Sequence, residues 1–299
     1  MEQNNLRISG ALLAVLGVVL FSSKAVMVKW AYRFGVGTVD LLLFRMLFAL
    51  PFYVGVVFWG ENRSKLTELG LKEILQLLFL GFVGYYLASL LDFMGLKYIK
   101  AGLERVVLFV YPTLVVLLSW LFFKERLSKK GWWAIGVTYI GVLVVFFPEL
   151  ELGGVHVLLG TALVFGSAFT YAIYIVGSGR LIPRLGSARF TAYSMIVASV
   201  CVFIHYGFQA QGGLWEYPWQ VYFIGVLMAL FATVIPSFLI AAAIKRMGAS
   251  RFSIFGSLGP VSTILLAYVF LGERIGGWQW LGMGIVILGV RLVGKRDKG

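Results

Sequence analysis

Five ionisable residues lie within or at the ends of long apolar segments of the chain: Lys24, Arg45, Asp92, Glu104 and Arg105. Ionisable side chains are costly in a bilayer, and those that occur there pair with one another or line a solute pathway. Counting along the expected helices places all five at similar depth. In one interpretation Arg45 pairs with Asp92 or Glu104 while Lys24 extends to the interface; in the other, Lys24 and Glu104 bind the charged groups of a zwitterion.

Hydroxyl and aromatic side chains form a second set of candidates. Ser167, Tyr171 and Tyr174 follow an i, i+4, i+7 spacing, which places them on one helix face. Hydroxyls beside aromatic rings suit a small amphipathic solute, and the alternative is ordinary packing between helices. Other candidates for lining the same cavity are Ser22, Tyr85, Ser89, Tyr111, Tyr193 and Ser257.

Three prolines interrupt apolar segments, namely Pro112, Pro236 and Pro260. Proline cannot donate a backbone hydrogen bond, so it kinks a helix and leaves a carbonyl free. Interrupted helices at matching positions in two halves of a chain indicate a midplane binding site. We therefore expect these prolines to act as hinges or to line a cavity, with a kink needed only for packing as the alternative.

The composition requires lipid as the solvent of these segments. Of the 299 residues, 60% are hydrophobic and 13% charged, and the mean hydropathy is +0.91. Soluble domains are about half apolar and about a quarter charged. A membrane-spanning helix needs about 20 apolar residues. We predict an all-α integral membrane protein with ten such helices, at 10–32, 38–59, 72–92, 100–123, 131–148, 155–178, 187–208, 218–243, 250–271 and 277–294.

The distribution of cations predicts the orientation. Of the 26 Lys and Arg residues, three lie within spans, and ten spans with the N-terminus inside leave five on the outer side: Lys29, Arg33, Lys97, Lys100 and Arg274. The remaining eighteen lie on the inner side, where Lys and Arg accumulate in membrane proteins. The net charge of +13 therefore indicates orientation in a bilayer rather than nucleic-acid binding.

An internal repeat relates the two halves. Residues 101–142 align without gaps to 249–290, at an offset of 148, and the identities include Pro112 with Pro260 and Glu125–Arg126 with Glu273–Arg274. The halves differ by five spans, an odd number, so the second half is inverted relative to the first. Inverted repeats are a transporter architecture with the substrate between the halves. We expect one membrane domain over 1–299, with repeats at 1–148 and 149–299.

These motifs resemble the EamA type of the drug/metabolite transporter superfamily. The resemblance rests on Tyr98–Gly102, Tyr111–Pro112, Phe123–Arg126 and Trp132, and on their counterparts Met247–Ala249, Gly259–Pro260, Leu271–Arg274 and Trp280–Gly282. It implies ten helices, both termini in the cytoplasm, a bacterial inner-membrane location, and export of amino acids, aromatic ones included, or other metabolites by alternating access. Exporters of cationic drugs or nucleosides share the fold and are the alternative.

Other classes fit less well. The chain lacks the H-E-x-x-H, G-x-S-x-G and P-loop motifs, so neither a membrane enzyme nor internal ATP hydrolysis is expected. An assembly subunit gains nothing from an inverted repeat. We expect no cofactor and no metal, a small-molecule substrate, and a functional monomer with a dimer as the alternative. Four charges at the ends of spans are expected to be structural: Glu125, Arg126, Glu273 and Arg274. The two glutamates lie near the start of the following helix and complement its dipole. Facilitated export and proton antiport through Glu104 both remain open.

Overall fold

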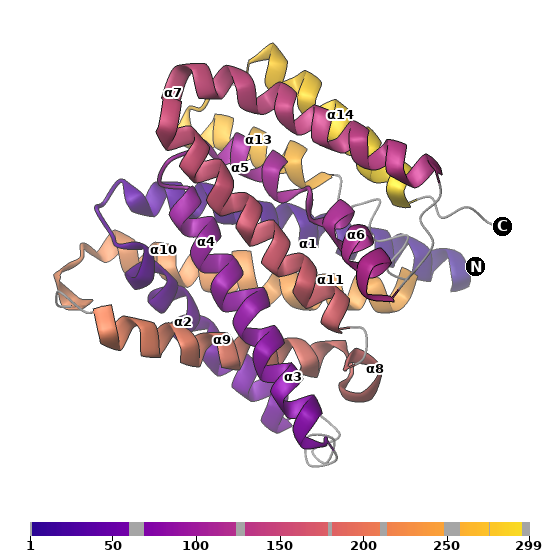
Figure 1. The fold of residues 1–299 in the computed structure, drawn as a ribbon. Helices are drawn as coiled ribbons and strands as arrows, with labels where there is room; N and C mark the ends of the chain where they lie inside the picture. Colours follow the sequence, from indigo (N-terminus) through magenta and orange to yellow (C-terminus); the bar gives the residue numbers. More distant parts are fainter. Residues whose placement is uncertain are drawn as a thin grey trace.

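The structure is a computed structural model that describes residues 2–59, 69–123, 129–178, 181–209, 214–247, 258–274 and 276–294, and these are largely helical (Figure 1). Three of the predicted residues, Glu125, Arg126 and Ser257, lie outside the described ranges.

The first half begins with two long helices and then contains several interrupted ones. Its elements are α1 (Glu2–Tyr32), α2 (Thr38–Trp59), α3 (Leu71–Gly81), the π-helix η2 (Phe82–Leu87), α4 (Ala88–Gly95), α5 (Ala101–Leu108), α6 (Tyr111–Phe123) and the beginning of α7 (Lys129–Ser178). The second half continues with the end of α7, α8 (Ile182–Leu185), α9 (Ser187–Gln209), the 3-10 helix η3 (Leu214–Glu216), α10 (Trp219–Ala229), the π-helix η4 (Leu230–Val234), α11 (Ile235–Met247), α13 (Leu258–Leu271) and α14 (Gly277–Gly294).

These elements confirm the ten predicted helices. Eight segments are long and apolar enough to cross a bilayer, and two shorter apolar helices, Leu258–Leu271 and Gly277–Gly289, correspond to the described parts of the ninth and tenth spans. The fifth and sixth spans are the two arms of α7, which bends at Gly154. This residue has a φ of +55°, a left-handed conformation that glycine adopts without strain. The chain is therefore a multi-pass membrane protein.

Both halves contain a π-helix at an equivalent position. The element η2 starts at Phe82 and η4 starts at Leu230, so they are separated by the same offset of 148 as the sequence repeat. In η4, Pro236 follows closely and cannot donate to the preceding turn, which favours the wider π-helical turn. In η2, a Cβ at Gly84 would overlap the ring of Tyr174. The repeat thus extends to interruptions that the proline pattern alone did not predict.

The halves are intertwined rather than separate. Helix α1 of the first half packs against α11 and α13 of the second, and α14 packs along α7. A Cβ at Gly141 would lie 2.8 Å from the carbonyl oxygen of Gly282, so these two helices approach closely. The interface between the halves therefore runs through the centre of the molecule.

The helices share two common ends. The end of α1, the start of α5, the bend of α7 and the turn between α13 and α14 lie at one end, which we call the Glu273 end (Figure 1). The first turn of α1 and the last turn of α14 lie at the opposite end. An even number of crossings requires this arrangement.

Candidate functional site

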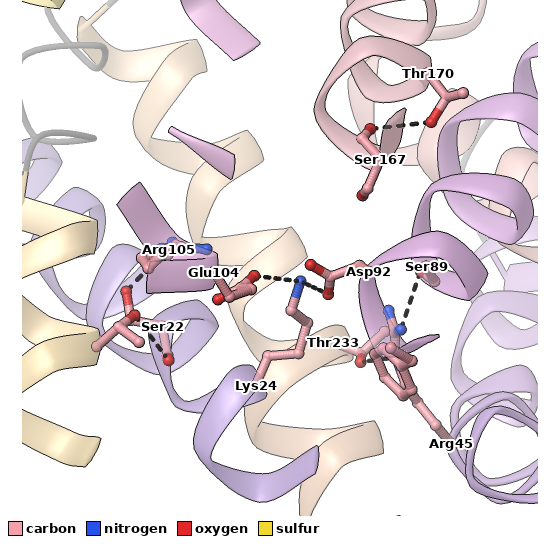
Figure 2. Close-up of polar contacts among 12 residues, drawn as sticks. Ser22, Lys24, Arg45, Ser89, Asp92, Glu104, Arg105, Ser167, Thr170 and Thr233 are labelled. Atoms are coloured by element: carbon pink, nitrogen blue, oxygen red, sulfur yellow. Dashed lines mark hydrogen bonds and ion pairs between the residues drawn. The ribbon is translucent and has the colours of Figure 1, made fainter. Parts of the chain in front are cut away.

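The ammonium of Lys24 lies between two buried carboxylates from different helices (Figure 2). Lys24 on α1 places Nζ 2.6 Å from Oδ2 of Asp92 on α4, and 3.9 Å from Oε1 of Glu104 on α5. Glu104 is completely buried and the side chain of Lys24 is 8% exposed. Because a charge in an apolar interior is stable only when paired, these residues hold α1, α4 and α5 together.

Arg105 extends this cluster toward the second half. Its Nη2 donates to Oγ of Ser22 at 3.4 Å, and Ser22 Oγ in turn lies 3.2 Å from the carbonyl oxygen of Gly259 on α13. Thr263, one turn along α13, donates to the carbonyl of Ser22 at 3.1 Å. A Cβ at Gly259 would lie 2.9 Å from Arg105 Nη2, so glycine allows α13 to approach the guanidinium. We call Ser22, Lys24, Asp92, Glu104 and Arg105 the central cluster.

The polar groups of the central cluster have unused binding capacity. Lys24 occupies Oδ2 of Asp92 and, at longer range, Oε1 of Glu104. Oδ1 of Asp92, Oε2 of Glu104 and Nε of Arg105 are buried, and none has a hydrogen bond or an ion pair among the described residues. Buried polar groups in native proteins almost always have partners, so unsatisfied ones indicate a functional site. Two cations and two carboxylates keep the cluster neutral overall.

Arg45 lies beside the central cluster and has other partners. Its Nε donates to Oγ1 of Thr233 in η4 at 2.8 Å, and its Nη1 donates to Oγ of Ser89 on α4 at 3.2 Å. Its guanidinium also lies over the ring of Phe93, 5.5 Å from the centroid. The predicted pairing of Arg45 with Asp92 or Glu104 is wrong.

The prediction that Lys24 extends to the interface is also wrong. Lys24 is the ion-pair partner of both carboxylates and is turned inward. The physical reason is position: α1 packs centrally between elements of both halves, so Lys24 faces other helices and has no route to the interface.

Four tyrosines form a continuous aromatic row. The ring centroids of Tyr111 and Tyr171 are 5.3 Å apart, those of Tyr171 and Tyr174 are 5.8 Å apart, and those of Tyr174 and Tyr85 are 5.0 Å apart. The row connects α6, α7 and η2 and thus crosses between the halves. Mixed stacked and edge-to-face pairs are the favourable geometries for such rings.

The remaining candidates lie around the cluster and the row. Tyr193 packs against the same apolar cluster as Tyr85 and Tyr171. Ser167 is buried on α7, where its carbonyl accepts a hydrogen bond from Thr170 at 3.0 Å (Figure 2). Pro112 begins α6 directly after the break that ends α5, and Pro260 follows Gly259 in α13.

Glu273 contacts a helix other than the one expected. Its Oε1 accepts from the backbone N–H of Ala101 at 3.1 Å, and its Oε2 from that of Gly102 at 3.4 Å. These groups begin α5 of the first half, whereas the sequence suggested the dipole of the helix after Glu273, which is α14. Arg274 is exposed. The expectation for Glu273 is thus corrected, because the turn after α13 folds back over α5.

Two pockets open at the Glu273 end. The first, which we call the basic pocket, has about 540 Å³, and its described lining includes the cations Lys29, Arg33 and Lys97 together with Glu273. The second has about 620 Å³ and lies beside Asp40 and Tyr217. The Tyr217 hydroxyl donates to Asp40 at 2.7 Å. Burial raises the pKa of Tyr217 to about 12, and the hydrogen bond to Asp40 acts in the same direction.

Several contributors to the site were not singled out from sequence. These contributors are Thr233, Thr263 and the carbonyl of Gly259, and all three come from the second half. Short hydroxyl side chains in apolar segments give a weak signal, although Thr233 stands at the repeat offset from Tyr85. Within the described ranges, no group of three His, Cys, Asp or Glu residues is placed to hold a metal ion.

Known proteins resemble the chain over nearly its full length. The transporter YcbK of Bacillus subtilis (strain 168), described as uncharacterized, is 31% identical over 95% of this chain and 92% of its own length. The threonine/homoserine exporter RhtA of Escherichia coli (strain K12) is 28% identical over 86% of this chain and 78% of its own. A crystal structure with 17% identity covers 95% of this chain and 97% of its own, with a TM-score of 0.63, which shows the same fold.

The pattern of one transporter family recurs in both halves. The EamA-like transporter family matches residues 8–147 and again 158–295, which agrees with the repeat of the helices and π-helices. The members of this family are transporters, so the chain is not an enzyme. The central cluster, the interrupted helices and the double match lead to one conclusion: the chain belongs to the EamA-like transporter family and is a secondary transporter of the drug/metabolite transporter superfamily.

Proposed function

We propose that this transporter exports small zwitterionic metabolites, and in particular amino acids. The observation that carries the proposal is the central cluster, in which one oxygen each of Asp92 and Glu104 and Nε of Arg105 are buried without a partner among the described residues. Asp92 and Glu104 offer acceptors for a substrate ammonium, and Arg105 offers a donor for a carboxylate, as guanidinium groups do elsewhere. The exporter RhtA, which handles threonine and homoserine, supports this substrate class.

The tyrosine row extends the proposed site toward larger side chains. Tyr85, Tyr111, Tyr171 and Tyr174 present rings and hydroxyls that would accommodate an aromatic amino acid. Ser22 and Ser89 supply further hydroxyls near the charges. Cationic drugs and nucleosides are the alternative substrates, because aromatic walls also bind such solutes.

We propose alternating access as the mechanism. The two halves carry matching interruptions, the π-helices η2 and η4 and the prolines Pro112 and Pro260, while Pro236 follows η4. Such interruptions let parts of a helix turn relative to each other. In this proposal the central cluster is the fixed site, and the described arrangement, with Glu104 fully buried, is an occluded one.

The proposed orientation places both termini in the cytoplasm of a bacterial cell, within the inner membrane. The excess of Lys and Arg in the sequence segments assigned to the inner side supports it, and so do the bacterial relatives. A monomer contains the complete central cluster, which supports function without a second copy.

The decisive experiment compares substrates that lack one charge. Purified protein in liposomes would be tested for uptake of labelled L-threonine and L-phenylalanine, in competition with their methyl esters, their N-acetyl derivatives, a nucleoside and a quaternary ammonium drug. We expect both amino acids to be transported and both singly charged derivatives to compete at least about tenfold less well, since each lost charge-assisted hydrogen bond contributes ~1.5–3 kcal/mol. Transport of the drug or nucleoside alone would remove the amino-acid proposal.

Two substitutions test which residue binds the substrate carboxylate and which binds its ammonium group. Arg105→Gln should weaken competition by N-acetyl derivatives, which keep the carboxylate, and Asp92→Asn should weaken competition by methyl esters, which keep the amine. The exposed Arg274→Gln is the matched control and should change neither. Equal losses for both derivative classes in both variants would contradict the proposal that Arg105 binds the carboxylate and Asp92 binds the ammonium.

For the energy source, we propose facilitated export down the substrate gradient. Lys24 and Arg105 balance Asp92 and Glu104, so the empty cluster needs no proton for neutrality. Glu104→Gln tests the alternative of proton antiport. We expect the pH dependence of exchange between inside and outside to be the same in this variant as in the unaltered protein. A pH dependence that disappears with Glu104→Gln would make Glu104 a proton carrier and overturn facilitated export.

A further inference from the structure

The turn after α13 connects the basic pocket to the start of α5, the helix that carries two members of the central cluster. Glu273 lines that pocket and accepts the backbone N–H groups of Ala101 and Gly102 at the start of α5. On the same helix, Glu104 lies about one turn further in and is completely buried. Glu273 therefore links the lining of the basic pocket to the helix that carries Glu104.

The helix α5 is a short piece that ends at a backbone break. It has only eight residues, and at its inner end Phe109 has ψ near 2°, which breaks the helix before Tyr111 and Pro112. Glu104 and Arg105 are carried on this piece. A movement of α5 about its inner break would thus move both charged groups of the site together with the outer contact.

The contact between Glu273 and α5 joins the two halves through two hydrogen bonds from backbone N–H groups to the carboxylate. The first N–H groups of a helix have no partner within the helix, so a carboxylate there is stabilising by both hydrogen bonding and the helix dipole. Here no side chain of α5 itself caps the helix, and the cap comes from the other half. A second contact lies alongside, where Arg33 Nη2 donates to the carbonyl of Leu271 at 3.1 Å.

We propose that Glu273 is a gating residue: its carboxylate on the N-terminus of α5 holds the Glu273 end of the transporter closed, and release of this contact opens the basic pocket onto the central cluster. The proposal rests on alternating access as proposed above. The turn that carries Glu273 begins at Gly272, whose φ of +69° sets the chain back over α5. The cations of the basic pocket then face a substrate carboxylate as it leaves Arg105.

A cysteine reporter tests the gate without reference to any substrate. In a Cys201→Ser background, Ser22→Cys places a nearly isosteric thiol in the central cluster, at a residue that is 1% exposed. Its rate of modification by the membrane-impermeant cation MTSET would be measured from each face of sealed vesicles. Trp215→Cys, which is 91% exposed and adjoins the Asp40 pocket through η3, identifies the Glu273 face and confirms reagent access.

We expect Glu273→Ala to raise the modification rate of the reporter about tenfold from the Glu273 face only, the population change that corresponds to ~1.4 kcal/mol. Glu273→Gln keeps one acceptor oxygen but loses the charge, so it should raise the rate less, by about threefold. The adjacent Arg274→Ala removes an exposed charge and should leave the rate unchanged.

The outcomes separate a gate from a static cap. Rates for Glu273→Ala and Glu273→Gln equal to that of Arg274→Ala would overturn the proposal, and so would an equal increase from both faces, which indicates general loosening. If Glu273→Ala does not fold, Glu273→Gln decides alone. The reporter assay uses no substrate, so its result can be interpreted even if the amino-acid proposal fails. Faster modification in Glu273→Ala, in a protein that transports none of the solutes tested, would support the gate and contradict the amino-acid proposal.

Discussion

The two halves share a backbone plan but differ in their buried chemistry. The π-helices η2 and η4 begin 148 residues apart, as do Pro112 and Pro260. Among the described residues, however, all the buried charged side chains belong to the first half. At the repeat offset, Glu104 and Arg105 correspond to Phe252 and Ser253 in the sequence.

In the mechanism proposed above, this difference divides the roles of the two halves. The shared interruptions let both halves bend in related ways, and the first half supplies the charges of the site at the interface. The second half contributes neutral groups instead, namely Thr233 to Arg45, and Thr263 and the carbonyl of Gly259 to Ser22.

The largest effect should come from removing the ammonium of Lys24, which pairs with both buried carboxylates. Lys24→Met leaves Asp92 and Glu104 buried without their shared partner, and breaking a buried ion pair in this way costs ~3–5 kcal/mol. We expect a large drop in the melting temperature in detergent and at least about a hundredfold loss of amino-acid transport. Lys97→Met, which removes an exposed cation of the basic pocket, is the control for stability.

The double variant Lys24→Met/Asp92→Asn sharpens this test. It removes one charge of each sign, so it should recover part of the stability lost in the single variant, as coupled neighbours do. If Lys24→Met is as stable and as active as the unaltered protein, the buried charges of the first half are needed for neither stability nor transport.

An intermediate effect should follow from removing the neutral partner in the second half. Thr233→Val keeps the shape of the side chain but deprives the buried Arg45 of its acceptor at 2.8 Å. An unsatisfied buried group costs ~1–3 kcal/mol, so we expect a lower melting temperature and transport reduced several-fold. Thr233→Ser retains the hydroxyl and should stay close to the unaltered protein. Equal behaviour of the two variants would mean that η4 does not support Arg45.

The smallest effect is expected in the tyrosine row, where both halves contribute alike. Tyr174→Phe removes a hydroxyl whose contact with Tyr85 is long, 3.5 Å, while the ring pairs remain. Stability should fall by about 1 kcal/mol at most, since a typical intramolecular hydrogen bond contributes ~0.5–1.5 kcal/mol and this one is long. Competition by L-tyrosine against L-threonine transport should weaken by a few-fold at most. A complete loss of transport would show that this hydroxyl belongs to the central site.

The fold was largely predictable because its signals are local or periodic. Apolar runs of membrane length predict the helices, and the Pro, Glu-Arg, Trp and Gly matches at one offset predict the repeat. Even the bend at Gly154 falls between two predicted spans. The π-helix η2 could not be predicted, since no proline interrupts Phe82–Leu87 and the interruption instead accompanies the close packing of Gly84 on Tyr174.

The charged members of the site were predictable from the sequence, but their pairings and their neutral partners in the second half were not. The cost of burying a charge singles out Lys24, Arg45, Asp92 and Glu104 from sequence alone, because it depends on residue type and on the apolar surroundings. Which cation meets which carboxylate depends on the rotation of each helix about its axis and on its neighbours. Those are results of packing, and they placed Lys24 rather than Arg45 between the carboxylates.

The sequence by itself determined a ten-helix membrane protein made of two related halves, with the charges of its apolar segments in the first half. Only the tertiary structure decided that the second half closes over those charges, with Gly259 against Arg105 and Glu273 on α5. The physical reason is range. Hydropathy and repeat offset are properties of segments, whereas a contact such as that between Glu273 and Ala101 joins residues far apart in the chain and exists only when all the helices between them have packed.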